Sequence, residues 1–253
     1  MKRYLSFGGG KRPLVIIPGL SLVDVTAGGA LLKVIFKQFT DEWTVYVIDR
    51  PESVEEGTTN ADLARDYMSL MMSLGISNAD IIGVSQGGMI AQHIAVERPE
   101  MVHKLVLGAT LSRSNANAET VIARWIQLAE ERQWYELNKD IFQKLYTEEY
   151  LKKNRLAVEI VAKAQKPSDP ERFIKLAKAC RSAGPFGELG RIHCPVLVMG
   201  GENDLVVTAE GSREIADAIE GSELFMFSCL GHAIYDESKD FYNKAREFLA
   251  RQG

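Results

Sequence analysis

Short runs of continuous apolar residues recur along the chain, each bounded by residues that favour turns. They fall at residues 14–17, 45–48, 81–84, 105–107, 196–199 and 224–227. Strands covered on both faces have this continuous apolar character, whereas half-exposed strands alternate apolar and polar residues. The sequence therefore predicts six strands of a buried sheet.

Helix-periodic patterns fill most of the intervals between these runs. We expect helices at residues 30–39, 60–74, 88–97, 209–219 and 239–249. Strands that alternate with helices are joined by crossover connections, which make neighbouring strands parallel. The chain is thus predicted to adopt an α/β fold with a mostly parallel central sheet flanked by helices.

The alternation stops between residues 112 and 190, where the pattern is helical throughout and rich in aromatic residues. One interpretation is ordinary helical packing, and the other is an inserted helical cap above the strand ends. We favour the cap because a long connection at the carboxyl edge of a parallel sheet lies where ligands bind. The expected core then comprises residues 1–111 and 191–253, and the expected cap comprises residues 112–190.

Composition narrows the function classes. The chain has 253 residues and a formal net charge of -4, so it lacks the basic footprint of a nucleic-acid-binding protein. No apolar run approaches the roughly 20 residues of a membrane span, and the first residues lack a signal-peptide core. The three cysteines Cys180, Cys194 and Cys229 are widely spaced, which disfavours a disulfide framework or a zinc site. We predict a cytoplasmic protein, monomeric or homodimeric, without nucleic-acid or membrane partners.

Residues 81–88 read Ile-Ile-Gly-Val-Ser-Gln-Gly-Gly and join a predicted strand directly to a predicted helix. A G-x-S-x-G motif in this context is typical of a nucleophile elbow, in which the serine occupies a sharp, strained turn. Side chains at Gly83 and Gly87 would collide there, and the N–H of Gln86 would face the substrate oxyanion. Glycine and serine also crowd into ordinary tight turns, which is the alternative interpretation of the motif. The flanking strand and helix favour Ser85 as a nucleophile.

A serine hydroxyl needs a base within hydrogen-bond reach, and the chain has four histidines. His93 falls within a predicted helix, and His103 and His193 precede strands, at the opposite edge of the sheet. His232 follows the last predicted strand and so shares the carboxyl edge with Ser85. We therefore predict His232 as the base, with a purely structural histidine as the alternative.

Asp204 follows the predicted strand at 196–199 and is the candidate third member of a catalytic triad. A carboxylate in this position would hold the imidazole tautomer and stabilise the imidazolium. Aspartates in loops are also frequent turn formers, and Glu202 is the nearest rival for the role. Asp236 and Glu237 are better suited to starting the final helix.

With these residues in place, the sequence resembles the α/β-hydrolase superfamily, in its small, capped, esterase-like and lactonase-like branch. The resemblance covers essentially the whole chain and rests on three motifs: Gly-Val-Ser-Gln-Gly-Gly at 83–88, Gly-Gly-Glu-Asn-Asp at 200–204 and Gly-His at 231–232. The chain order Ser, Asp, His is that of this superfamily. The predicted cap has no matching motif.

Two loops depart from the family pattern. The resemblance assigns the second oxyanion N–H to Leu20, but Pro18 stands where relatives carry a histidine, and a simple strand-to-loop turn is the alternative interpretation. Proline could brace this loop by fixing its own backbone. The Asp49-Arg50-Pro51 stretch retains only the Asp and Arg of a longer family loop, so we interpret Arg50 as structural or loop-bracing.

The resemblance implies hydrolysis of a small ester, thioester or lactone through an acyl-enzyme on Ser85, with no metal or cofactor. A serine at position 85 excludes the aspartate-nucleophile chemistry of dehalogenases and epoxide hydrolases in this fold. Acyl transfer, perhydrolysis, hydroxynitrile lysis and ligand binding without turnover remain alternatives. The predicted cap has a small excess of Lys and Arg, which could favour an acidic acyl group or could be an ordinary solvated surface.

Overall fold

The computed structural model describes residues 3–251, and its framework is one seven-stranded sheet in the order β1-β3-β2-β4-β5-β6-β7. The strands are β1 (Tyr4–Phe7), β2 (Arg12–Ile17), β3 (Trp43–Ile48), β4 (Ala79–Val84), β5 (Val102–Gly108), β6 (Val196–Gly201) and β7 (Glu223–Phe227). β1 pairs antiparallel with β3, and every other neighbouring pair is parallel. The prediction of a mostly parallel sheet is therefore confirmed, and β1 is the strand that the sequence pattern does not reveal.

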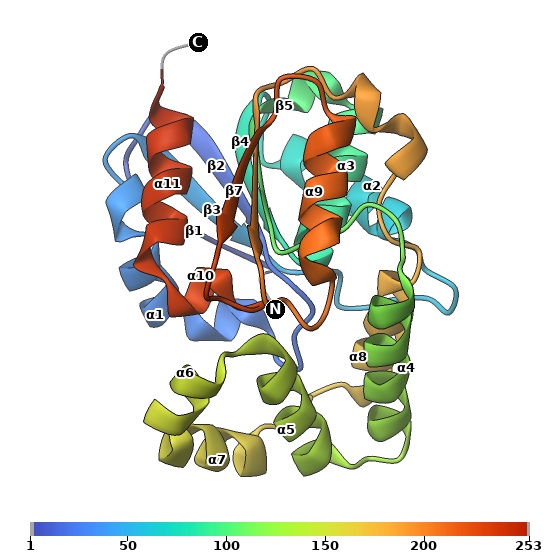
Figure 1. The fold of residues 1–253 in the computed structure, drawn as a ribbon. Helices are drawn as coiled ribbons and strands as arrows, with labels where there is room; N and C mark the ends of the chain where they lie inside the picture. Colours follow the sequence, from blue (N-terminus) through green and yellow to red (C-terminus); the bar gives the residue numbers. More distant parts are fainter. Residues whose placement is uncertain (1–2, 252–253) are drawn as a thin grey trace.

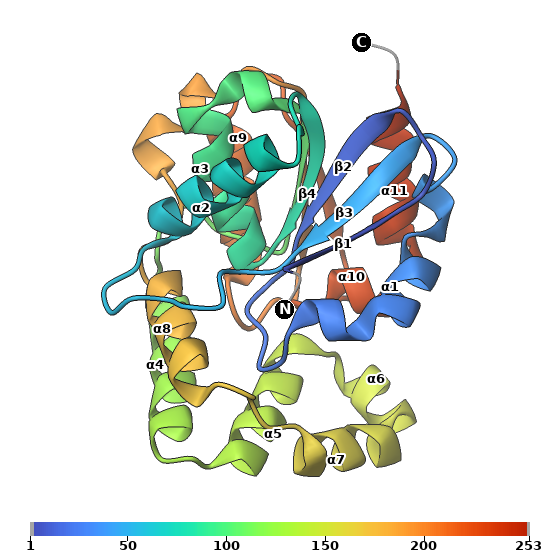
Figure 2. The same cartoon turned by 180° about the vertical axis from the view of Figure 1, so that it is seen from behind.

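Helices cover both faces of the sheet, as the continuous apolar strands require (Figures 1 and 2). One face carries α2 (Asn60–Ser73), α3 (Gln86–Glu97) and α9 (Thr208–Ala218), and the other carries α1 (Gly29–Ile35) and α11 (Lys239–Ala250). The predicted helix at 30–39 is in fact α1 followed by a short 3-10 turn, Lys37–Phe39. Each face has its own buried cluster, with Tyr67 and Ile90 in the first and Phe39 and Phe241 in the second.

Five helices follow one another between β5 and β6: α4 (Ala116–Glu130), α5 (Trp134–Leu145), α6 (Glu148–Lys153), α7 (Arg155–Ala164) and α8 (Pro170–Cys180). We call them the α4–α8 layer; Figure 1 shows them below the carboxyl ends of the strands. Side-chain oxygens of Asn115, Thr147 and Asp169 cap the first turns of α4, α6 and α8. A third buried cluster joins Trp125 and Phe173 of this layer to loop residues of the sheet, so the layer is packed onto the core.

The boundaries of the predicted cap at residues 112 and 190 stay a prediction. Close to the second boundary, the 3-10 turn Phe186–Arg191 buries Leu189 in the cluster on the α3 face. Within residues 3–251, no helix has both the length and the apolar character that crossing a membrane requires. The expectation of a monomer or homodimer also stays a prediction.

Candidate active site

Ser85 occupies the turn between β4 and α3, with φ of 52° and ψ of -123°. A non-glycine residue in such a conformation is strained by about 1–3 kcal/mol and persists only where its surroundings hold it. The Ser85 N–H donates to the Gly108 carbonyl at 2.9 Å, and the Ser85 carbonyl accepts from the Thr110 hydroxyl at 2.7 Å. Both partners belong to β5 or the segment directly after it, so the neighbouring strand holds this turn in place.

The glycines on either side of Ser85 are required by close backbone contacts. A Cβ on Gly83 would lie 2.6 Å from the Gly87 carbonyl oxygen, and one on Gly87 would lie 2.0 Å from the Ile17 carbonyl oxygen. Gly87 thus allows α3 to begin directly against the end of β2. The structure agrees with the steric argument that the G-x-S-x-G spacing suggested.

Three predicted side chains meet at the carboxyl edge of the sheet. His232 follows β7, and its Nε2 lies 3.0 Å from the Ser85 Oγ. Its Nδ1 lies 2.8 Å from Oδ2 of Asp204, which follows β6. His232 and Asp204 are 2% and 6% exposed, so the hydrogen bond between them is shielded from water.

Hydrogen bonds hold the Asp204 carboxylate in its ionised form. Burial by itself would raise the pKa of Asp204, but the charge and hydrogen bond of His232 outweigh it, together with the Val206 and Val207 N–H groups. The two N–H groups donate to Oδ1 at 2.7 and 2.9 Å, which leaves Oδ2 for the imidazole. The net result is a pKa of Asp204 below the ordinary value of 3.8.

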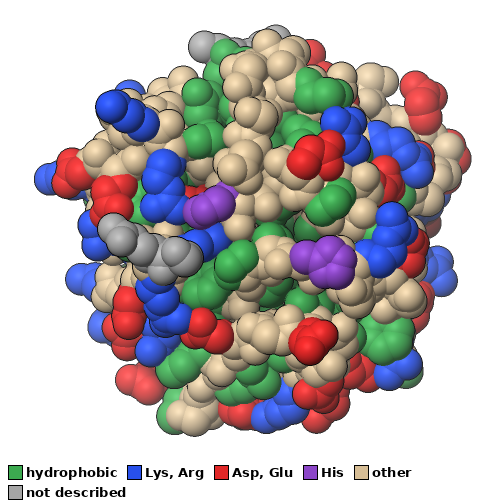
Figure 3. All heavy atoms as spheres, turned by 90° about the horizontal axis from the view of Figure 1, so that it is seen from above, with side chains coloured by type: hydrophobic (Ala, Val, Ile, Leu, Met, Phe, Trp, Pro, Cys, Tyr) green, Lys and Arg blue, Asp and Glu red, His purple; other side chains and the backbone are tan. Residues whose placement is uncertain are grey.

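The structure does not bring the rival residues to Ser85. Glu202 pairs with Arg213 on the surface at 2.6 Å. His93 lies within α3, and His103 and His193 are exposed at the opposite edge of the sheet. Figure 3 looks onto the molecule from that side, where histidine side chains lie at the surface.

The loop after β2 lies directly against the Ser85 side chain. A Cβ added to Gly19 would be 3.1 Å from the Ser85 Cβ, so only glycine allows this approach without a shift. Leu20, the next residue, borders the space around Ser85. The Gln86 side chain is completely buried, and its amide donates to the Leu176 carbonyl of α8 at 2.9 Å. Both predicted oxyanion donors therefore belong to residues that lie beside Ser85.

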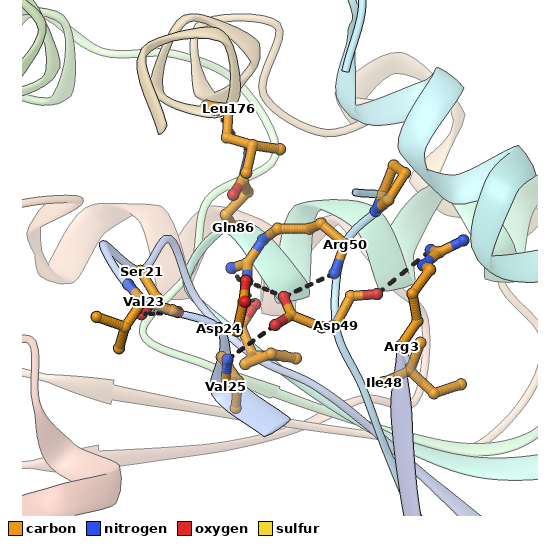
Figure 4. A network of polar contacts seen from close by, with 12 residues as sticks. Arg3, Ser21, Val23, Asp24, Val25, Ile48, Asp49, Arg50, Gln86 and Leu176 are labelled. Atoms are coloured by element: carbon orange, nitrogen blue, oxygen red, sulfur yellow. Dashed lines mark hydrogen bonds and ion pairs between the residues drawn. The ribbon is translucent and has the colours of Figure 1, made fainter. Parts of the chain in front are cut away.

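Arg50 braces the loop after β2, in keeping with the structural or loop-bracing role that the sequence suggested. Its Nη2 donates to the Pro18 carbonyl at 2.9 Å, and its Nη1 lies 3.4 Å from the Asp49 carboxylate. Figure 4 shows Asp49 between Arg50 and Val25. The Val25 N–H donates to Oδ2 of Asp49 at 2.8 Å. A buried guanidinium thus braces the loop that contains Pro18, and proline is not the sole brace of the loop.

Arg172 extends this network to the α4–α8 layer. From α8 it donates to the carbonyls of Arg50 and Pro51 at 3.1 and 2.8 Å and pairs with Asp24 at 3.2 Å. Sequence reasoning did not single out Arg172, because its partners lie more than a hundred residues away in the chain. It ties α8 to the loops beside the candidate oxyanion site.

Two known protein families match this chain. Residues 75–239 match the hydrolase family described as serine aminopeptidase, S33, and residues 12–135 match the family described as the alpha/beta hydrolase fold. The chain belongs to the α/β-hydrolase superfamily. The family resemblance inferred from the three sequence motifs is thus confirmed.

Known relatives of this α/β-hydrolase include hydrolases with different substrates in their names. A Klebsiella pneumoniae protein provisionally named carbamate hydrolase RutD is 28% identical over 188 residues, 72% of this chain and 70% of its own. A Vibrio cholerae pimeloyl-[acyl-carrier protein] methyl ester esterase is 22% identical and covers 99% of both chains. The crystal structure of an enol-lactonase from Burkholderia xenovorans shares the fold, with a TM-score of 0.86, 21% identity and coverage of 98% and 96%.

In this hydrolase, Ser85 opens onto a cavity of about 390 Å³ between the sheet and the α4–α8 layer. Its walls are mainly apolar and aromatic, with Phe36 on one side and Phe142, Tyr146 and Phe173 on the other. His232 also borders this cavity. The arrangement brings a serine hydroxyl, an imidazole and an apolar cavity together in one place.

Asp236 and Glu237 do not start the final helix, contrary to the expectation from sequence. Ser238 caps α11, and the two acids instead bind the turn between α5 and α6. Asp236 accepts from the Tyr146 hydroxyl at 2.8 Å, and Glu237 accepts from the N–H and hydroxyl of Thr147 at 2.8 and 2.6 Å. A third contact joins the Ala233 N–H to the Leu145 carbonyl at 2.9 Å. The segment after His232 is thus fastened to the α4–α8 layer.

Proposed function

We propose that this chain is a serine hydrolase that cleaves a small carboxylic ester, thioester or lactone through an acyl-enzyme on Ser85. The observation that carries the proposal is the hydrogen-bonded series Ser85, His232 and Asp204, with distances of 3.0 and 2.8 Å. The series ends at a strained serine that borders an apolar cavity. This combination of strain, burial and alignment is what nucleophilic catalysis by serine needs.

The reaction begins when His232 Nε2 takes the Ser85 proton and the Ser85 Oγ attacks the substrate carbonyl carbon. Asp204 keeps the proton of the imidazole on Nδ1, so that Nε2 is free to accept, and it stabilises the imidazolium that forms. The tetrahedral intermediate collapses as its bond to the leaving oxygen or sulfur breaks and His232 returns the proton to that atom. Water, activated by the same histidine, then hydrolyses the acyl-enzyme.

The backbone N–H groups of Leu20 and Gln86 are the proposed oxyanion donors. Gln86 is the first residue of α3, whose N-terminus carries partial positive charge toward Ser85. The bond from Arg50 to Pro18 fixes the chain two residues before Leu20. One such donor is typically worth about 3 kcal/mol of transition-state stabilisation.

The comparisons support hydrolysis by this fold without choosing a substrate. The names of the Vibrio and Burkholderia proteins refer to a methyl ester and an enol-lactone, and that of the Klebsiella protein refers to a carbamate. Each has a carbonyl that a serine can attack. We propose a small-molecule substrate, bound between the sheet and the α4–α8 layer acting as a cap.

A panel of 4-nitrophenyl esters with acyl chains of increasing length tests the proposal. We expect turnover by the wild-type protein and a loss of about 10⁶-fold in kcat in Ser85→Ala. Ser69→Ala is the matched control, because Ser69 is exposed on α2 and should leave the rate unchanged. A fluorophosphonate should label the wild type and Ser69→Ala, but not Ser85→Ala. Undiminished turnover in Ser85→Ala would exclude the mechanism.

A further inference from the structure

Ser85 stands at the junction of two cavities of very different size. The larger is the apolar cavity of about 390 Å³ described above. The smaller, of about 30 Å³, lies on the other side of Ser85 beneath α4. Ser85, Leu20 and Trp125 border both and therefore separate them. A carbonyl attacked by Ser85 has two substituents, and each must enter one cavity.

The position of His232 decides which substituent enters which cavity. His232 borders the larger cavity and is absent from the wall of the smaller one. When the tetrahedral intermediate collapses, the bond from carbon to the leaving oxygen breaks, and that oxygen takes its proton from Nε2. The leaving group must therefore extend from the histidine side, into the larger cavity. The acyl substituent, which remains bonded to Ser85, is left with the smaller one.

The two volumes then set the sizes of the groups. A cavity of about 150 Å³ accommodates benzene, so about 390 Å³ holds a substituted ring or a chain of comparable bulk. A cavity of about 30 Å³ has about one fifth of the volume that accommodates benzene, which suits a methyl or ethyl group. An acyl chain of four or more carbons would need the walls of the smaller cavity to move.

The inner walls of the smaller cavity are closely packed, and at its surface end Glu119 accepts hydrogen bonds from Ser114 at 2.6 Å and from Arg181 at 3.0 Å. Leu111, Ile122 and Val207 are 1%, 7% and 2% exposed and belong to the buried cluster that joins the α4–α8 layer to the sheet. The Trp125 ring between the cavities is held by a hydrogen bond from its Nε1 to Asp140 at 2.8 Å. Adding methylenes to such a packed site typically costs about 1–3 kcal/mol.

We infer that the substrates are esters of a short acyl group, acetyl or propionyl, with a large, apolar alcohol or phenol. The inference rests on the proposed function, because it needs Ser85 as nucleophile and His232 as proton donor. It goes further by fixing which side of the ester bond carries the bulk. An ester with a long acyl chain and a small alcohol is accordingly a poor substrate.

Two isomeric esters provide a direct test. 2-Phenylethyl acetate and methyl 3-phenylpropanoate have the same atoms and exchange only the sides of the ester group. We expect kcat/KM to be at least about tenfold higher for the acetate, because misplacing even one methylene in an apolar pocket typically costs tenfold or more. Equal values, or a preference for methyl 3-phenylpropanoate, overturn the inference while Ser85-dependent turnover upholds the proposed function. Absence of turnover for both isomers overturns the inference if 4-nitrophenyl esters are still cleaved through Ser85, and contradicts the function itself if they are not.

A matched pair of variants locates the effect. Ile122 borders the smaller cavity alone and Ile141 the larger cavity alone, so Ile122→Ala and Ile141→Ala make the same change on opposite sides of Ser85. Ile122→Ala should raise the ratio of kcat/KM for 2-phenylethyl butanoate over the acetate by about tenfold. Ile141→Ala should leave this ratio near that of the wild type, and circular dichroism confirms that both variants are folded. A shift of the ratio in Ile141→Ala instead assigns the acyl group to the larger cavity and refutes the inference.

Discussion

Replacing Arg50 by methionine would remove the support of the proposed oxyanion loop. Arg50 is 2% exposed, and its guanidinium connects the Pro18 carbonyl at 2.9 Å with the Asp49 carboxylate at 3.4 Å. Methionine has a similar apolar stem and no charge, so both contacts disappear while much of the packing stays. We expect the backbone at Leu20 to lose its fixed position relative to Ser85.

The size of the effect follows from these contacts. Removing one partner of a buried ion pair typically costs about 3–5 kcal/mol, and an unpaired buried carbonyl adds to it. Asp49 keeps the Val25 N–H at 2.8 Å and the Arg172 guanidinium at 3.6 Å, so the lower end applies. We expect the free energy of unfolding to fall by about 3 kcal/mol. Misalignment of one oxyanion donor should lower kcat by about 10²-fold.

The assay combines steady-state kinetics on a 4-nitrophenyl ester with urea unfolding. We expect kcat to fall in Arg50→Met while KM changes by no more than about twofold, because the loss is confined to the transition state. Arg50→Lys should recover part of kcat, since one ammonium group can reach only one of the two acceptors at a time. This partial rescue separates a positioning role from a general loss of packing.

Arg12→Met is the control for stability alone. Arg12 pairs with the buried Asp80 at 2.7 Å, at the amino-terminal edge of the strands and far from Ser85. We expect this variant to unfold at lower urea concentration but to keep its kcat. If Arg50→Met behaves in the same way, with reduced stability and an unchanged kcat, the proposed support of the oxyanion loop is refuted.

Three further outcomes follow from the site. Asp204→Asn should lower kcat by about 10⁴-fold and Glu202→Gln should not, and the reverse result would transfer the role to Glu202. Because the folded-state pKa of Asp204 lies below its ordinary value of 3.8, the unfolded chain takes up this proton first as the pH falls. The stability from this group is therefore present above that value and lost below it, so urea unfolding from about pH 5 to about pH 3 should show a steeper loss in the wild type than in Asp204→Asn. Gly87→Ala would place a Cβ 2.0 Å from the Ile17 carbonyl oxygen and should prevent formation of the active turn, whereas Gly187→Ala meets no atom within 4 Å and should be neutral in the same thermal unfolding and ester assays.

The fold was predictable because most of its signals are local. Each buried parallel strand is a continuous apolar run, and the order of strands and helices restricts the topology to few arrangements. β1 was not predicted because it has only four residues at the edge of the sheet, and none of them is fully buried. Its neighbour β3 supplies the pairing that makes it a strand, and pairing is invisible in the sequence of β1 alone.

The site was predictable as far as strand ends determine it. Ser85, Asp204 and His232 each follow a parallel strand, and such strands end at one edge of the sheet. The contacts made by Arg50 and Arg172 depend on which loops come together at that edge. The spacing of residues in the sequence does not indicate which loops these are. The same limit explains the wrong prediction for Asp236, which was expected to start the final helix because it lies just before it in the sequence. Its actual partner, Tyr146, is 90 residues away in the chain.

The three contacts between the turn at residues 145–147 and the segment after His232 bear on how this enzyme can be redesigned. Two of the contacts use side chains, Asp236 and Glu237, and one uses the Ala233 backbone. A chimera that received its α4–α8 layer from a relative would leave these acids facing foreign residues, only four and five positions after His232. Chimeras of this fold should therefore exchange residues 233–237 together with the α4–α8 layer, both taken from the same protein.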